Sequence, residues 1–591
     1  MTLKVSIVFS FVLTATILGP HARAQSTQKP AEEVGPGSTK LGSITGRVLA
    51  DGQPVNNASI TATSLNSTGQ SRAVPTNDAG DFEVKGLEPG VYRIRAAAPG
   101  YVSPSTDSDE ETYYRVGDPV RLTMTRGGVI TGKVLRAEDE PVVAIRVRAT
   151  MIRDMNGKSP TTVEASLDEL TDDRGIYRIY GLAPGRYVVF AGGRGSRGFG
   201  TNAYDNDAPT YSPSSTRDTA AEISVGSGEE KAVDIRYRGD VGHAVSGTVI
   251  APTNPNAPWI SINLARLIEA APDVRMSTYQ NAGGKGFEFY GVTDGEYLVW
   301  AQYAPGSGET FVSEPRRITV KGADVTGIEL TAKPLATVGG ELVLEPSTAE
   351  ACKEKRRPLF DETLVAIQRN PKAAPKDQPQ VPLYGAAQAS PDKTGSFVLR
   401  NLAVGQYSLE VRFFARYWYL RSITQRTATA TSKEATNSQT TDVARTWFTL
   451  KSGDRVTGLK VTLAEGAASL AGQITVPPDQ KLPPQMFIYL VPAEKERSDD
   501  VLRFFAAQVE ADGSFALDHL PPGHYWSLAK VTSEGELTST AKLRLPGSAE
   551  ARLKIRREAE AAKFEVELKP CQNASDHKLP LKSPVGTATG R

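Results

Sequence analysis

Cysteine and histidine are scarce in this sequence, which limits the chemistry that its side chains can support. Cys352 and Cys571 are the two cysteines among 591 residues, and the sequence contains five histidines. Two cysteines far apart do not make a disulfide framework, so we expect two free thiols and leave their pairing open. A catalytic zinc ion usually takes three clustered ligands, often histidines, and neither HExxH nor HxxE occurs. We therefore predict no metal site and no cofactor.

An excess of charge of one sign is also missing, as are the motifs of nucleophilic catalysis. Lysine and arginine number 68, against 67 aspartates and glutamates. A binder of nucleic acid or of anionic membranes would show a basic bias, so this balance argues against both. The GxSxG motif of hydrolases does not occur, and no cysteine stands next to a plausible histidine partner. These absences predict a protein that is not an enzyme and has no catalytic residues.

Long hydrophobic runs are lacking after the N-terminus. Residues 6–18, SIVFSFVLTATIL, follow Lys4, and residues 22–24, ARA, fit the small-x-small pattern of a cleavage site. The run is too short to span a bilayer comfortably. We predict a signal peptide over 1–24, export to the periplasm or the extracellular space, and no transmembrane segment in the mature chain. The polar leader, 25–40, and the polar tail, 571–591, are expected to be disordered.

What the sequence does contain is a recurring pattern of aromatic residues and glycine. An aromatic residue is followed ten positions later by a tyrosine, and a glycine stands two positions before that tyrosine. The pairs are Phe82 and Tyr92, Tyr177 and Tyr187, Phe287 and Tyr297, Phe397 and Tyr407, and Phe515 and Tyr525. Apolar residues two positions from each ring share its strand face. Each copy therefore predicts two antiparallel strands joined by a short turn, with both rings inside a core.

A second motif precedes each copy and helps to divide the chain. Strands with a central glycine, such as ITGRV at 44–48, predict a close approach of backbone. Alternating runs, the last being FEVEL at 564–568, predict closing strands that abut the opening strand of the next domain. The predicted domains are 41–126, 127–240, 241–334, 335–466 and 467–570, called modules one to five below. Loops are expected at 103–118, 192–220 and 422–442, and a helix at 548–562.

The combination of motifs resembles the carboxypeptidase regulatory-like domains. The best matches are 41–101, with ITGRV, DAGDF and LEPGVY, and 127–191, with ITGKV, DDRGIY and LAPGRY. The resemblance implies transthyretin-like β-sandwiches, which occur in tandem in exported bacterial proteins and are related to carbohydrate-binding-like folds. The expected fold class is all-β: five tandem antiparallel β-sandwich domains, transthyretin-like or Ig-like, in an extended array. The family name refers to a non-catalytic appendage.

Aromatic residues beyond the repeat gather in RFFARYWYLRS, residues 412–422. Tyr417, Trp418 and Tyr419 are surplus to the core pattern and are the candidate binding residues. Exposed aromatic rings beside arginine can stack on sugar rings or contact a protein partner. The alternative is that they pack beneath the insert at 422–442 or close a domain interface.

Two further groups of polar residues are assigned to turns. His519 and His524 flank one turn, and solvated turn residues are favoured over a surface metal contact. Acidic residues before glycine, such as Asp172 and Asp512, match no EF-hand spacing and are expected to cap their own turns.

These observations predict an exported, non-enzymatic modular protein that acts as a scaffold or protein-interaction module at the cell envelope. The alternative is a carbohydrate-binding protein that uses the exposed aromatic residues of module four. The expected partner is therefore an envelope protein or a polysaccharide.

Overall fold

The structure is a computed structural model, and it describes most of the chain after residue 40. The described residues are 41–65, 69–103, 112–158, 166–193, 203–251, 259–268, 271–281, 286–303, 309–370, 372–373, 388–428, 438–476, 482–483, 485–531 and 543–581. The predicted signal peptide and leader lie outside this set. Residues from Leu41 onward form one compact unit by backbone contacts, so the five modules are used here as names for ranges. Residues 571–581 are counted with module five, because β42 (Asn573–Pro580) pairs with β36 (Ala468–Thr475).

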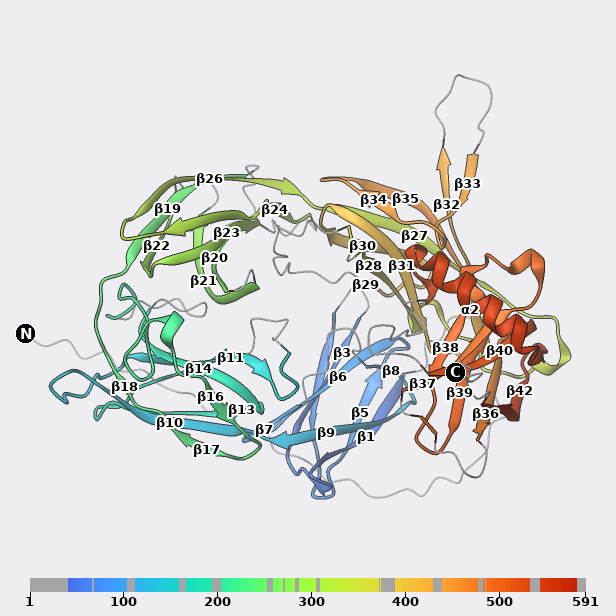
Figure 1. The fold of residues 1–591 in the computed structure, drawn as a ribbon, viewed down its shortest axis with the longest axis horizontal. Helices are drawn as coiled ribbons and strands as arrows, with labels where there is room; N and C mark the ends of the chain where they lie inside the picture. The colour runs from blue at the N-terminus through green and yellow to red at the C-terminus, as the bar shows by residue number, and fades with distance from the viewer. Residues whose placement is uncertain are drawn as a thin grey trace, which may run out of the picture. The chain divides into compact units, whose positions relative to one another are not determined.

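Modules one and two each consist of two sheets (Figure 1). Module one has β1 (Gly42–Ala50), β2 (Gln53–Pro54), β5 (Asp81–Leu87), β7 (Tyr101–Val102) and β9 (Pro119–Arg126) in one sheet, and β3 (Ser59–Ser64), β4 (Ser71–Pro75), β6 (Val91–Ala97) and β8 (Tyr113–Arg115) in the other. Module two has β10 (Gly128–Leu135), β13 (Ile176–Leu182), β17 (Glu230–Ala232) and β18 (Ile235–Arg236), and then β11 (Arg146–Asp154), β12 (Ser166–Leu170), β14 (Gly185–Ala191), β15 (Thr210–Tyr211) and β16 (Ile223–Val225).

In module three the two layers are joined into one sheet by the pairing of β24 with β26. Its strands are β19 (His243–Ile250), β20 (Trp259–Ile268), β21 (Ala271–Asn281), β22 (Phe287–Val292), β23 (Gly295–Tyr303), β24 (Phe311–Ser313), β25 (Arg316–Val320) and β26 (Val325–Pro334).

Modules four and five return to separate sheets, and module five adds the α-helix that the sequence predicts. Module four has β27 (Ala336–Glu345), β30 (Ser396–Leu402), β32 (Trp418–Ala428), β33 (Ser438–Asp442) and β35 (Arg455–Glu465), and then β28 (Thr363–Arg369), β29 (Gln388–Ala389), β31 (Gly405–Phe413) and β34 (Phe448–Leu450). Module five has β36 (Ala468–Thr475), β39 (Ser514–Leu520) and β42 (Asn573–Pro580), and then β37 (Met486–Pro492), β38 (Phe505–Gln508), β40 (Gly523–Val531) and β41 (Glu565–Leu568), with α2 (Ala549–Ala562). The all-β fold class is confirmed.

The opening strand of each module pairs in parallel with a closing strand of the same module. The pairs are β1 with β9, β10 with β17 and β18, β19 with β26, β27 with β35, and β36 with β42. The closing strands still lead directly into the next module, since β9 ends at Arg126 and β10 begins at Gly128.

The central glycine of the opening strand makes this parallel pairing possible. A Cβ atom added at Gly46 would lie 2.3 Å from the carbonyl oxygen of Val120 and 2.6 Å from the ring of Phe82. The same position in module four, Gly340, would meet the Leu459 carbonyl oxygen at 2.6 Å. Both distances are well below van der Waals contact, so a side chain here would push the strands apart. The predicted close approach of backbone is confirmed.

The two strands of each repeat do not form the hairpin that the sequence predicts. In module one, β5 pairs with β1 and β6 pairs with β3, so the turn between them crosses from one sheet to the other. The other modules repeat these strand pairings, and in module three the turn crosses between the two layers of the joined sheet. Strand periodicity fixes which face of each strand is buried, but it does not determine the hydrogen-bonded neighbour.

A residue with left-handed backbone conformation stands at the same position of each copy, near the end of the ladder between the first strand of the repeat and the opening strand. These residues are Gly86, Gly181, Gly291, Asn401 and His519, with φ between 58° and 73°. Each falls within a register shift of its ladder, as where Gly42 faces Leu87 but Ser43 faces Lys85. Such a bulge bends the strand, and it lies where the chain leaves one sheet for the other.

The repeated tyrosine is hydrogen-bonded in every copy to the turn that precedes it. Each hydroxyl donates to the carbonyl oxygen four residues earlier: Tyr92 to Glu88 at 2.8 Å, Tyr187 to Ala183 at 2.6 Å, Tyr297 to Thr293 at 2.8 Å, Tyr407 to Ala403 at 2.8 Å, and Tyr525 to Pro521 at 2.7 Å. Immunoglobulin-like sandwiches use a similar tyrosine corner. A tyrosine is therefore required here for its hydroxyl as well as for its ring.

We expect Tyr187→Phe to lower the free energy of unfolding of module two by about 1 kcal/mol, because the Ala183 carbonyl loses its donor. Tyr187 is 1 % exposed, so water would not easily replace the hydroxyl. Urea unfolding followed by hydrogen exchange of module-two peptides would measure the change. Tyr180→Phe is the control, since Tyr180 is 54 % exposed; equal effects of both changes would contradict the role of the corner.

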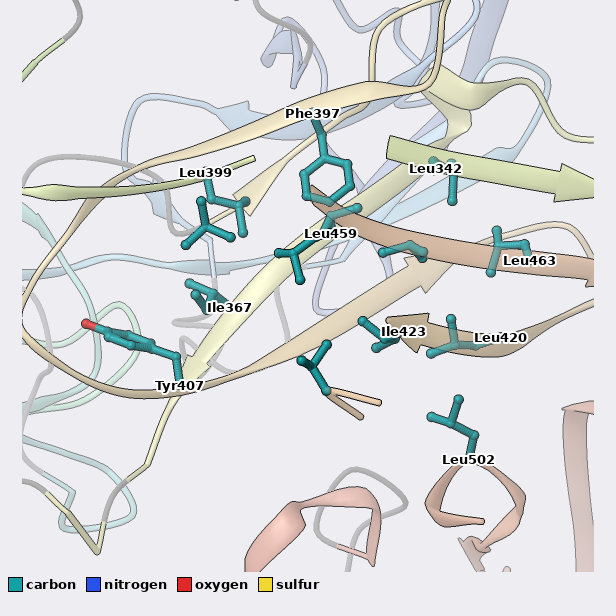
Figure 2. Packing of buried hydrophobic residues seen from close by; sticks show 14 of the residues in the cluster. Leu342, Ile367, Phe397, Leu399, Tyr407, Leu420, Ile423, Leu459, Leu463 and Leu502 are labelled. Carbon is teal, nitrogen blue, oxygen red and sulfur yellow. The ribbon is translucent and has the colours of Figure 1, made fainter. Parts of the chain in front are cut away.

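The recurring rings fill the cores, as the sequence predicts. All ten residues of the five pairs are at most 6 % exposed. Figure 2 shows the Phe397 ring of module four beside Leu399 and Leu459, and Tyr407 and Ile367 belong to the same apolar cluster. The rings are thus interior residues of the sheets and leave no face for a ligand.

Modules four and five share apolar packing and a disulfide. Leu502, from the 3₁₀ turn Val501–Arg503 of module five, belongs to the core cluster of module four and lies on the side of Leu420 (Figure 2). Cys352 and Cys571 form a disulfide with their Cα atoms 5.4 Å apart. The expectation of two free thiols is therefore wrong, because the fold brings together two cysteines that are remote in sequence.

Four segments assigned to disorder or loop contain strands. The expected loops at 103–118 and 192–220 contain the short strands β8 and β15. Residues 573–580, placed in the disordered tail, form β42 at the edge of the first sheet of module five. NASDHKLP has a single buried apolar residue, Leu579, and no clear alternation, so the period-two signal of a strand is missing from its sequence. The FEVEL run forms β41 in the second sheet instead of closing the first. In the insert at 422–442, β32 and β33 pair with each other.

Candidate interaction surfaces

The three aromatic candidates of module four do not form one exposed platform. Trp418 is 1 % exposed and belongs to the core cluster of the module. Tyr417 and Tyr419 are half-buried. The alternation along the strand explains the difference, because neighbouring residues point to opposite faces. The indole is thus unavailable to a sugar ring, and a role for the two tyrosines in binding stays a prediction.

Tyr417 has two cations near its ring and lies at the boundary of modules four and five. The Lys355 ammonium is 5.0 Å and the Arg416 guanidinium 5.8 Å from the centre of its ring. The Asn573 side chain, from β42, donates to its hydroxyl at 3.4 Å, and this hydrogen bond lowers the pKa of the phenol. These contacts favour the reading in which the aromatic residues close a domain interface.

His519 is also a boundary residue and not a solvated turn residue. Its Nδ1 atom lies 2.9 Å from the carbonyl oxygen of Trp418, and its ring contacts the edge of Phe413 at 4.7 Å between ring centres. Burial lowers the pKa of His519, which keeps the ring neutral at neutral pH. His524 instead faces Glu565 at 3.1 Å, so the two histidines have separate surroundings.

The acidic turn residues cap their own turns, as predicted. The Asp172 carboxylate accepts the backbone N–H groups of Arg174 and Ile176 at 2.9 and 2.8 Å. Asp512 accepts the backbone N–H of Ser514 in the same way, at 2.9 Å. Hydrogen bonds to Ile176 and Arg174 lower the pKa of Asp172. Within the described ranges, no group of three His, Cys, Asp or Glu side chains is placed to hold a metal ion.

A cavity of about 470 Å³ between residues of modules two and three is lined by charges of both signs. Arg266, which is 7 % exposed, donates to the Asp218 carboxylate at 2.9 and 3.0 Å and to Thr293 at 2.9 Å. At its rim Arg317 is 3.5 Å from Glu296. Both arginines of the lining therefore pair with carboxylates of the same chain, and the Arg266–Asp218 pair joins module three to module two.

Comparison with known proteins identifies one part of the chain. Residues 43–125 match the Carboxypeptidase regulatory-like domain. The match confirms the resemblance for module one. No curated protein matches the chain.

The solved structures found to be similar are distant. The Bacillus anthracis TIE protein is 16 % identical over 50 % of this chain and 51 % of its own, with a TM-score of 0.14. The minor pilin GBS52 of Streptococcus agalactiae is 14 % identical over 36 % and 99 %, with a TM-score of 0.18. The shaft pilin spaA of Lactobacillus rhamnosus GG is 11 % identical over 34 % and 99 %, with a TM-score of 0.17. These low scores carry no argument about function.

The carboxypeptidase regulatory-like domain carries a contact that consecutive modules of an extended array would not make. Val91 and Tyr113 of this domain form a buried cluster with Leu364 of module four. Leu65 and Phe414 pack against the same cluster. No sequence pattern indicates that these residues meet, because their strands lie far apart in the chain.

No helix among the described residues is long and apolar enough to cross a membrane.

Proposed function

We propose that the chain is an exported, non-enzymatic scaffold whose modules present a surface to a protein partner at the cell envelope. The observation that carries the proposal is the burial of the recurring aromatic residues in every module. These rings stabilise the modules and are not available to a ligand. The charged cavity between modules two and three supports it, because its arginines are paired with acidic residues of the same chain. Such paired side chains suit contacts between modules.

Export is supported by two independent features. The N-terminal sequence has the charged start, apolar run and cleavage pattern of a signal peptide. The Cys352–Cys571 disulfide fits an oxidising compartment, where such bonds form and persist.

The test of the proposal uses the full mature chain and an envelope extract of the organism that produces it. Proteins retained by the immobilised chain would be identified, purified and titrated against it. We expect saturable binding of at least one purified envelope protein. If no purified candidate binds saturably, the scaffold function is wrong.

A parallel titration with envelope polysaccharides tests the carbohydrate alternative. We expect no retention of polysaccharide by the native chain. Polysaccharide binding that is lost in Tyr419→Ala but kept in Tyr180→Ala would favour the alternative, because Tyr180 is an exposed tyrosine of module two.

A further inference from the structure

Modules one and four each have apolar residues on the outer face of their second sheet. On β6, Tyr92 and Ile94 point into the core of module one, so Val91 points outward. On β28, Val365 and Ile367 point into the core of module four, so Leu364 points outward. An isolated sandwich would expose these outer residues to water.

The outer residues are nevertheless buried. Val91 is 1 % exposed, Tyr113 is 6 % exposed and Leu364 is fully buried. The residues of the cluster come from both modules, which lie some 270 residues apart in the chain, so each module supplies the cover for the other. Module five covers the outer face of its own second sheet differently, with Ile555 and Ala559 of α2 (Figure 1). An apolar outer face that needs a cover is therefore a recurring property of these modules.

Polar contacts next to the apolar cluster also join module one to module four. The Gln388 side-chain amide donates to the Tyr113 hydroxyl at 2.7 Å. The Arg115 guanidinium lies 5.8 Å from the centre of the Phe414 ring. Its Nη1 atom is also 3.9 Å from the carboxylate of Glu362, which is 2 % exposed. A buried apolar centre with polar and cationic contacts at its rim is the usual composition of a specific interface.

We propose that module one docks on module four through this face in the native chain, as an intramolecular interface centred on Tyr113 and Leu364. The proposal is independent of any envelope partner. The few residues involved would hold two separate molecules together poorly. Within one chain the covalent connection raises the effective concentration of one module at the other, which favours a small interface. The occupant is thus the chain's own first module.

The interface can be tested in the full chain by hydrogen exchange with Tyr113→Ala. We expect amide exchange in residues 361–369 of module four to accelerate by roughly fivefold or more, because the cover of Leu364 is lost. Exchange in residues 81–87 should stay unchanged and would show that module one remains folded. Unchanged exchange in 361–369 would overturn the proposal. Tyr180→Ala, at an exposed tyrosine of module two, is the matched control and should affect neither segment.

The reciprocal change distinguishes an interface from a local defect. Leu364→Ala should accelerate exchange in residues 113–115 and 91–97 of module one, whereas a change confined to module four would contradict docking. A dilution series separates the chain's own module from a second copy. Protection that is independent of protein concentration supports the proposal, and protection that is lost on dilution would assign the face to a second copy.

Discussion

Phe82→Ala is expected to lower the free energy of unfolding of module one by about 3–5 kcal/mol, the range found when a buried phenylalanine is truncated in a core. Phe82 is 5 % exposed and belongs to the core cluster that contains Ile44, Val84 and Tyr92. Its ring lies directly against Gly46 of the opening strand. The substitution therefore leaves a cavity where the two strands of the first sheet pair, and glycine has no side chain with which to fill it.

Hydrogen exchange in increasing urea would measure this loss, because peptides report on each module separately. We expect exchange in residues 287–303 of module three to keep its urea dependence. Lys85→Ala, on the solvent side of the same strand, serves as the control and should leave module one within about 0.5 kcal/mol of the native value. An equal shift in modules one and three would show that the modules unfold as one unit.

The sequence was sufficient to predict the strands of the modules and their buried faces. It was insufficient to predict which strands pair with one another. The period-two pattern of Phe82 and Val84 correctly identified a strand and its buried face. It could not show that the next strand belongs to the opposite sheet, because a hairpin and a crossing turn bury the same residues. Gly86, at left-handed φ, is the local signal of the bulge, but Asn401 and His519 occupy the same position in other copies and conceal it.

The prediction of the candidate binding residues differs from the structure because it did not take into account which face of each strand is buried. The adjacency of Tyr417, Trp418 and Tyr419 suggests one group of exposed rings, yet strand alternation places the indole in the core. Leu364 could have been noticed from the sequence TLVAIQR, in which apolar residues occur on both faces of β28. Such a strand indicates that both faces are covered, but the identity of the cover is a property of the tertiary structure alone.

Removing the disulfide by Cys352→Ser together with Cys571→Ser is expected to destabilise modules four and five by about 2–5 kcal/mol. The bond closes a loop over a sequence separation of 219 residues, so its loss frees a long stretch of the unfolded chain. Val501 and Leu502 still pack in the core of module four, so the two modules should stay associated in the native state.

Urea unfolding of the double variant and of the native chain, with and without a reductant, separates this effect from a defect of packing. The reductant should destabilise the native chain as much as the substitutions do, and it should leave the double variant unchanged. Exchange in module two should not respond, because Tyr187 and its neighbours lie outside the loop that the bond closes. Two titratable thiols in the native chain before reduction would contradict the prediction. That result would also remove the disulfide as a support for export. The N-terminal pattern would then be the remaining support, and it rests on the sequence alone.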